Sequence, residues 1–256
     1  FHRWAEAINA SIGSAMSEDK IREVIQDQME FWSFFEAEIV SRERSPGQDL
    51  LSAIATATSA IDAPLTLSEK VGFCSQLIGA GADTTTKLIG FATLAMAQDQ
   101  SLQEELRRSP EKIGAFAEEI LRLEPPVQGM FRVTTADTEL NRVHIHQGSM
   151  VWLLYGSANR DDSVFACPNE VNLKRPNPGD HLSFGSGPHI CIGANLAREV
   201  AHSVLTQLLA QTQWLEIPDS RQPPTVLPSY VMHGLAALTV QLTRSGASDF
   251  DPARCQ

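Results

Sequence analysis

The chain has 256 residues, and its 43% hydrophobic and 20% charged content is ordinary for a globular protein. The formal net charge of −11 and the lack of a basic run argue against nucleic acid or an anionic membrane as the main partner. Its four cysteines include no C-x-x-C pair, so neither a disulfide framework nor a zinc knuckle is indicated. Without a signal peptide or an apolar run of about 18 residues, the sequence predicts a protein of the reducing cytoplasm that does not enter a membrane.

The N-terminal part is expected to be helical. Apolar residues follow helical spacing from Phe1 onward, which predicts a helix over 1–15 and a chain that is a piece of a longer protein. A second helix is expected from the N-cap Ser17 to about Arg44, and a short third helix from Asp49.

The longest helical pattern runs from Leu67 to about Gln98 and opens with the capping box Thr66-Leu-Ser-Glu69. At about 1.5 Å per residue this helix would be about 48 Å long, so it must cross the whole domain. We expect it to be the central element of the fold.

The middle of this long helix is a poor helix-forming segment, because 79–86 combines two glycines with three threonines. A threonine hydroxyl here is expected to bond back to a carbonyl one turn earlier. Two interpretations remain open. The segment is either a kink that lets another helix come close, or a groove where a ligand touches the backbone and where Asp83 and Thr84 face it.

Further helices are predicted over 102–108, 110–123 and 194–211. Short alternating runs over 127–155 predict a small antiparallel sheet, and a terminal strand is expected over 238–242. The remaining stretches are an irregular connection over 158–180, of a length that is often functional, and a loose tail over 245–256.

A glycine-rich loop, Phe184-Gly-Ser-Gly-Pro-His-Ile-Cys-Ile-Gly193, carries the most distinctive chemistry. A thiolate at Cys191 would sit just before a helix N-terminus, where the helix dipole favours negative charge. Gly185 and Gly187 permit positive φ, and Gly193 permits close approach of a flat ligand on which Phe184 would stack. A turn with a buried structural cysteine and a phosphate-cradling loop remain alternatives.

Three motifs occur in a defined order along the chain. The loop matches F-x-x-G-x-x-x-C-x-G, an E-x-x-R pair (Glu119, Arg122) precedes it, and Ala-Gly-x-Asp-Thr-Thr at 80–85 comes first. Together they resemble the cytochrome P450 family. The resemblance implies a mainly α fold with small antiparallel β elements, in which 1–244 form the C-terminal part of one haem-thiolate domain.

The resemblance also implies roles for individual residues. Cys191 would be the proximal ligand of the iron of haem b, and it is the metal ligand that we expect in this chain. Asp83 and Thr84 would be the catalytic pair that delivers protons to bound dioxygen. Arg132 and His189 match positions that pair with the haem propionates. The expected cofactor-binding set is completed by Phe184, Gly193, Ala80 and Gly81.

The implied activity is that of a soluble bacterial monooxygenase that hydroxylates or O-dealkylates a small organic substrate. Electrons would come from NAD(P)H through a ferredoxin reductase and a ferredoxin. Lys174, Arg175 and Arg198 are candidate contacts for an acidic ferredoxin, and scattered surface charge without a partner is the alternative interpretation. The segment 126–132 resembles that of members that act on small aromatic acids.

Two departures from the family pattern affect these expectations. Glu170 stands where the family usually has Arg or His, so the third member of the Glu119 and Arg122 cluster is not identified. About 150 residues of a typical domain are absent before the match, which would leave the apolar face of 67–98 partly bare. The alternative function is therefore an inactive haem-binding fragment or an interaction module.

Overall fold

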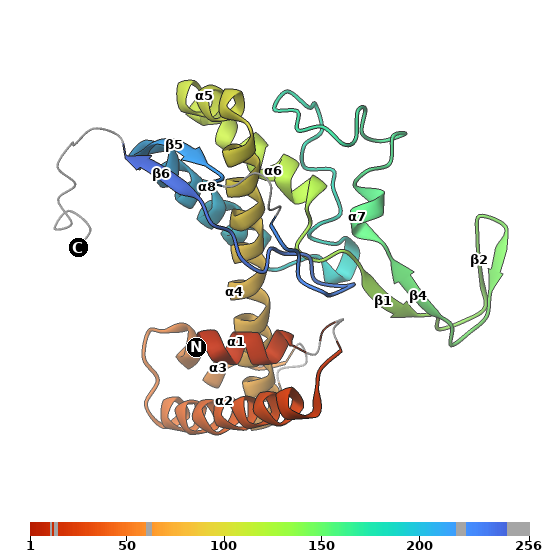
Figure 1. Cartoon of the computed structure of the whole chain (residues 1–256). Coiled ribbons are helices and arrows are strands. Elements are labelled where there is room, and N and C mark those ends of the chain that lie inside the picture. Colours follow the sequence, from red (N-terminus) through yellow and green to blue (C-terminus); the bar gives the residue numbers. More distant parts are fainter. Residues whose placement is uncertain (11, 13–14, 60–62, 219–223, 245–256) are drawn as a thin grey trace. The chain divides into compact units, whose positions relative to one another are not determined.

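The computed structural model describes all residues except 11, 13–14, 60–62, 219–223 and 245–256 (Figure 1). The expected tail over 245–256 thus lies outside the described residues. Two compact units make up the chain, Phe1–Thr84 and Thr85–Gln256. The mainly helical class with small antiparallel β elements is confirmed. None of the described helices combines the length and the apolarity needed to cross a membrane.

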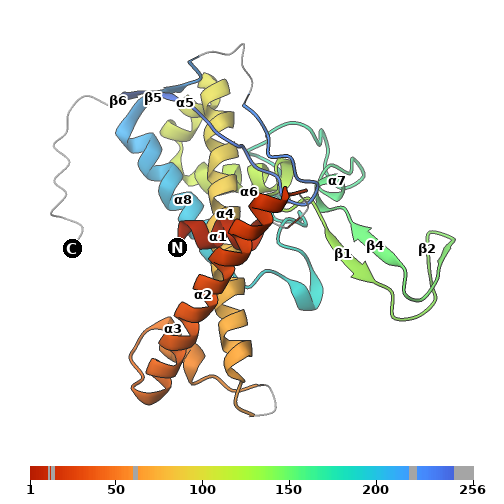
Figure 2. The same ribbon diagram turned by 60° about the horizontal axis from the view of Figure 1, so that its bottom comes forward.

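The described part of unit 1 is mainly helical (Figure 2). Its elements are α1 (His2–Asn9), α2 (Glu18–Arg44), α3 (Leu50–Ala55) and the first part of α4 (Leu67–Gln98). The predicted N-cap of α2 is confirmed, because the Ser17 hydroxyl accepts a hydrogen bond from the Lys20 amide. The expected first helix is shorter than 1–15, because α1 ends at Asn9.

The capping box at the start of α4 is confirmed. The Thr66 amide donates to the Glu69 carboxylate at 2.7 Å, and the Glu69 amide donates to the Thr66 hydroxyl at 3.3 Å. The core of unit 1 lies between the helices and is rich in aromatic rings. Its buried members are Phe31, Phe35, Ile39, Ile54, Ala55, Val71 and Cys74.

Unit 2 carries the remaining described helices and all the described strands. Its helical elements are the second part of α4, α5 (Gln100–Arg108), η1 (Pro110–Lys112), α6 (Ile113–Leu123), α7 (Tyr155–Ala158), η2 (Gly187–His189) and α8 (Ala194–Gln211). Side chains of α4, α5, α6 and α8 form its hydrophobic core, in which Leu106, Phe116 and Leu205 are fully buried. Burial of each such side chain stabilises the fold by about 1.5–3 kcal/mol.

The described strands form three separate two-stranded antiparallel sheets rather than one. They are β1 (Met130–Val133) with β4 (Met150–Leu153), β2 (Thr138–Leu140) with β3 (Val143–Ile145), and β5 (Thr212–Glu216) with β6 (Gln241–Arg244). The terminal strand therefore lies over 241–244 and not 238–242. Its partner β5 follows α8 directly, and neither β5 nor the short helix α7 was expected.

The connection over 158–180 is irregular, as predicted, and it is held in place from within. Asn159 is fully buried, and its side-chain oxygen accepts a hydrogen bond from the Leu182 amide at 2.7 Å. The side-chain nitrogen of Asn159, Nδ2, donates to Ser183 Oγ at 2.9 Å. One buried amide therefore fixes the backbone that leads into the cysteine loop.

The distribution of exposed apolar side chains differs from the expectation. Among the described residues, α4 exposes one large apolar side chain, Phe73. One bare apolar row runs instead from Ile192, just before α8, into that helix, where Leu196, Val200 and Val204 follow at every fourth residue and are also exposed. The face expected on 67–98 is thus mostly covered or built from small residues.

Candidate functional site

The cysteine loop has a backbone that needs glycine at two positions. Gly185 and Gly187 have φ angles of +69° and +71°, in the left-handed region where other residues are strained. The loop closes on itself, because the Cys191 amide donates to the Phe184 carbonyl at 2.9 Å. The expectation of positive φ at these two glycines is confirmed.

Cys191 lies at the surface of unit 2, so the alternative of a buried structural cysteine is wrong for this position. Cys74 in unit 1 is the buried cysteine, and burial raises the pKa of its thiol. Gly193 is the N-cap residue of α8. A Cβ at Gly193 would meet Cys191 Sγ at 3.8 Å, an ordinary contact, so the packing of this chain does not require glycine there.

Phe184 is oriented by the first turns of α8. The Arg198 guanidinium lies over the Phe184 ring, 4.5 Å from its centroid. Arg198 in turn donates two hydrogen bonds to the Glu118 carboxylate, at 2.7 and 3.0 Å. The ring that opens the cysteine loop is thus fixed through a side chain of α6.

Glu118 contacts two side chains behind the loop. Besides Arg198, it contacts His181 Nε2 at 3.1 Å. Burial by itself would raise the pKa of Glu118, but the hydrogen bonds with His181 and Arg198 outweigh it and lower the pKa from 4.5 to about 2. No local motif predicts this trio, because Glu118, His181 and Arg198 lie on three separate segments.

The Glu119 and Arg122 pair is fully buried, although opposite charges three residues apart on a helix more often form a surface pair. Arg122 also donates to the backbone carbonyls of the irregular connection, those of Asn159, Pro168 and Glu170. The pair thus anchors that connection to α6.

The third member of this cluster is Arg175. Its Nε donates to Glu119 Oε1 at 2.8 Å, and its side chain is 2% exposed. Glu170, which stands where a basic residue was expected, contributes its backbone carbonyl instead. The doubt about this network is removed. Arg175 is also withdrawn from the expected ferredoxin surface, because a buried and paired guanidinium cannot meet a partner.

The two residues expected at the haem propionates both lie in unit 2. Arg132 is on β1, where it pairs with Val151 of β4, and its Nη1 donates to the neighbouring Phe131 carbonyl. His189 ends η2, two residues before Cys191, and its side chain is exposed. The structure therefore leaves the His189 imidazole accessible to a ligand beside the cysteine.

The middle of α4 belongs to unit 1 up to Thr84. The Thr84 hydroxyl donates to the Ala80 carbonyl at 2.6 Å, which is the expected bond one turn back. A Cβ at Gly79 would lie 2.5 Å from Ile8 Cγ2, so this glycine lets α1 approach α4. A Cβ at Gly81 would meet nothing within 4 Å. Close helix packing is thus confirmed at Gly79, while Gly81 leaves the helix backbone open.

Asp83 has a partner that sequence reasoning missed. Asn9 Nδ2 lies 3.4 Å from Asp83 Oδ2 and donates to the Gly79 carbonyl at 2.7 Å. The amide and the carboxylate are 74 residues apart, and no local motif signals such a pair. Ala80, Gly81, Asp83 and Thr84 therefore all lie on the part of α4 that belongs to unit 1, whereas the cysteine loop belongs to unit 2.

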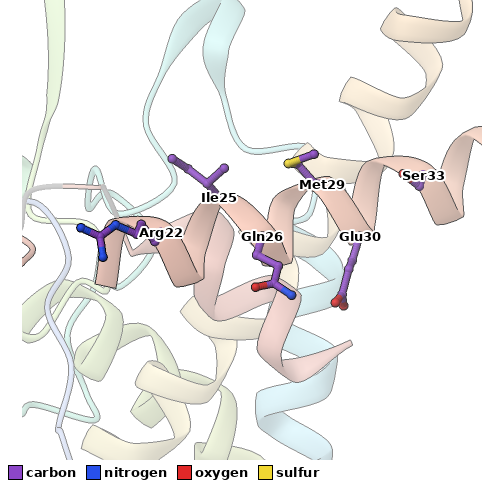
Figure 3. Close-up of a pocket in the computed structure, with 6 residues that line it drawn as sticks. All are labelled: Arg22, Ile25, Gln26, Met29, Glu30 and Ser33. Atoms are coloured by element: carbon purple, nitrogen blue, oxygen red, sulfur yellow. The ribbon is translucent and has the colours of Figure 1, made fainter. Parts of the chain in front are cut away.

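A surface groove on α2 contains none of the expected site residues. Figure 3 shows that its lining comes from a single helix, so no second element encloses it. The lining residues are Arg22, Ile25, Gln26, Met29, Glu30 and Ser33. One helix face cannot surround a ligand, so this groove is not a cofactor pocket.

Comparison with known proteins gives consistent matches. The family model for cytochrome P450 matches residues 14–243. Cytochrome P450 109 of Bacillus spizizenii is 37% identical over 220 residues, which are 85% of this chain and 54% of the relative. The biotin biosynthesis cytochrome P450 of Bacillus subtilis is 36% identical over 217 residues, 84% of this chain and 54% of the relative.

Solved structures agree with these matches. Cytochrome P450 CYP109Q5 from Chondromyces apiculatus has a TM-score of 0.84 and 31% identity, covering 96% of this chain and 59% of its own. P450BioI in complex with an acyl carrier protein that bears hexadec-9Z-enoic acid has a TM-score of 0.85 and 33% identity, covering 93% and 60%. The chain spans about half the length of the curated relatives it matches. Because the family model covers residues 14–243, which are most of its length, this chain belongs to the cytochrome P450 family.

Proposed function

We propose that the protein is a haem-thiolate monooxygenase that activates O2 to hydroxylate or O-dealkylate a small organic substrate. The observation that carries the proposal is the exposed Cys191 in a loop shaped by two left-handed glycines. Residues 1–244 would be the C-terminal part of a single domain, acting in the cytoplasm.

The residues around Cys191 fit haem b, the cofactor of the family. Ile192, next to the thiol, is 87% exposed, and a flat apolar ligand over it would remove this surface from water. Gly193 leaves room for that ligand, since its backbone carries no side chain. Cys191 would ligate the iron, while Arg132 and His189 would hold the propionates. When bound, haem b supplies a redox-active iron whose thiolate ligand favours O–O cleavage.

The half of the site on α4 would move protons. The Thr84 hydroxyl now donates to the Ala80 carbonyl, and a rotation about its χ1 would redirect that proton toward a ligand at the open Gly81 backbone. The Asp83 carboxylate, held by Asn9, would take up protons from solvent and reload the hydroxyl. These two side chains are the catalytic residues of the proposal.

Electrons are proposed to come from NAD(P)H through a ferredoxin reductase and a ferredoxin. The balanced reaction is RH + O2 + NAD(P)H + H⁺ giving ROH, water and NAD(P)⁺. Of the three basic residues expected to meet the ferredoxin, Lys174 is exposed, Arg198 is partly exposed and bound to Glu118, and Arg175 is buried. Lys174 therefore remains as the proposed contact.

A small aromatic acid is the proposed substrate class. The segment 126–132 that suggests it includes Phe131, which stacks on Trp152 of β4 with 5.5 Å between ring centroids. Both rings are partly exposed and offer a flat apolar surface. Methoxybenzoate is a suitable probe, because O-demethylation releases formaldehyde in a one-to-one ratio with O2 consumed.

The test is turnover of methoxybenzoate by the haem-loaded chain under two regimes. With NAD(P)H, reductase, ferredoxin and O2, formaldehyde is expected, and it should vanish when O2 or the ferredoxin is withheld. Product formed with hydrogen peroxide but never with O2 and the electron donors would contradict the monooxygenase proposal.

A second candidate is an interaction module, and the apolar row on α8 favours it. Leu196 is 70% exposed, and Val200 and Val204 continue the row on the same helix face. Such a row favours contact with another apolar surface. If the isolated chain takes up no haem yet forms a defined complex through this row, the module is the better description.

A further inference from the structure

Outside the cysteine loop and α4, one cluster of described side chains combines metal ligands of different types. Asp137, His144 and His146 each offer one donor atom, and these atoms all lie within 4.8 Å of one another. The cluster lies on the ribbon formed by β2 and β3, which projects from the rest of unit 2 (Figure 1). It shares no residue with the proposed haem site.

The hairpin places these residues on one face. His144 lies on β3 and His146 directly follows its last residue, and side chains two positions apart along an extended chain point to the same side. Asp137 immediately precedes β2, whose Thr138 pairs with Ile145. The strand pairing thus brings the aspartate opposite the end of the histidine pair.

A tight turn fixes this register. Asn141 and Arg142 join the two strands with φ angles of +52° and +66°, as a two-residue hairpin turn with two left-handed residues requires. The Gln147 amide also donates to Asp137 Oδ1 at 2.8 Å. This bond orients the carboxylate from outside the cluster, as second-shell partners do at metal sites.

The distances between the donor atoms of these three side chains are close to those between the ligand atoms of a bound metal ion. His144 Nε2 lies 3.7 Å from Asp137 Oδ2, and His146 Nδ1 lies 3.9 Å from Asp137 Oδ1. The two imidazole rings are 4.6 Å apart, at an angle of 82°. Tetrahedral Zn²⁺ with bonds of about 2.0–2.1 Å separates its ligand atoms by about 3.4 Å. Small rotations of these exposed side chains therefore close the site.

We propose that this hairpin binds a divalent transition metal ion, with Zn²⁺ as the best match. Two imidazoles and one carboxylate suit Zn²⁺ better than Mg²⁺ or Ca²⁺, which take oxygen ligands. Three protein ligands leave the fourth position to water. The bound ion joins β2 to β3 and stabilises the projecting ribbon.

The test is calorimetric titration of the chain with ZnCl2, with Cys167 and Cys191 replaced by serine so that exposed thiolates do not compete. One tight site per chain is expected. His144→Ala and His146→Ala should each weaken binding by about tenfold or more, the scale on which single ligands and their supports act. Asp137→Asn keeps an acceptor for the Gln147 amide but loses the charge, so it should weaken binding as well.

His2→Ala is the matched control. His2 lies 3.5 Å from Glu6, so it is an exposed histidine beside one carboxylate but lacks the three-ligand cluster. Its replacement should leave the affinity unchanged. Equal affinity in the His144→Ala, His146→Ala and unmutated chains would overturn the proposal.

Nuclear magnetic resonance gives a second readout that needs no change in the cluster. On addition of ZnCl2, the imidazole resonances of His144 and His146 should shift together and saturate at one equivalent. Shifts confined to other histidines, or no shift at one equivalent, would contradict the site even if a variant failed to fold.

Discussion

Arg175 donates a hydrogen bond to the Glu119 carboxylate at 2.8 Å, across 56 residues of sequence. Both side chains are removed from water, and Arg122 shares the same carboxylate. The pairing ties the irregular connection to α6. Two guanidinium groups and one carboxylate therefore hold the backbone from which the cysteine loop emerges.

Arg175→Ala should destabilise the chain strongly. It leaves part of the buried Glu119 carboxylate without a partner, and breaking such a buried pair costs about 3–5 kcal/mol. Glu170→Ala should change the free energy of unfolding by less than about 0.5 kcal/mol, because only its backbone carbonyl takes part. Urea denaturation followed by circular dichroism measures both. Equal losses in the two variants would show that the cluster is assigned to the wrong residue.

Stability should depend on Glu118 at acidic pH. The folded pKa of about 2 lies below the ordinary value of 4.5, so the contribution of this group is complete above about pH 4.5 and is lost as pH falls toward 2. The contribution of this group is on the order of 3 kcal/mol, since one pKa unit corresponds to about 1.4 kcal/mol. Between these pH values, the free energy of unfolding of Glu118→Gln should fall less steeply than that of the unmutated chain. Parallel curves would contradict the pKa assignment.

Two glycines of α4 should respond differently to alanine. Alanine favours a helix over glycine by about 1 kcal/mol, and Gly81→Ala should gain this because nothing surrounds the added methyl group. Gly79→Ala places the methyl against the stiff side chain of Ile8, and such overpacking costs about 1–3 kcal/mol. In thermal unfolding, the midpoint temperature of Gly81→Ala should be higher than that of Gly79→Ala. The reverse order would mean that α1 does not pack at Gly79.

Thr84→Ala should uncouple electron use from product formation if Thr84 delivers protons. With methoxybenzoate, NAD(P)H, the ferredoxin system and O2, formaldehyde should fall by about a hundredfold while NAD(P)H is still consumed. Thr93→Ala is the matched control, because the Thr93 hydroxyl makes the same bond one turn back, to Ile89 at 2.8 Å. If both variants stay coupled, Thr84 has only a structural role.

The sequence predicts local structure well where one segment carries the whole signal. The helices over 18–44, 67–98 and 194–211 have the expected ends, because caps and apolar spacing act within a few residues. The pairing of β5 with β6 was not predicted. This pairing joins segments about thirty residues apart, and the spacing of apolar residues within one segment does not predict which distant segment it will pair with.

The same distinction holds for the candidate site. The motif residues, the positive φ of Gly185 and the bond from Thr84 follow from local chemistry. The roles of Arg175 and Asn9 depend on tertiary contacts and were missed. The zinc cluster had a partial signal, since histidines two apart in an alternating run must share a strand face.

The carbon monoxide spectrum of the reduced, haem-loaded chain is the most direct test of Cys191 as a thiolate ligand. A strongly red-shifted Soret band is expected for the unmutated chain. Cys191→Ser should abolish it, and Cys167→Ser should not, although both thiols are exposed. Survival of the band in Cys191→Ser, or its absence from the unmutated chain after haem is bound, would contradict the assignment.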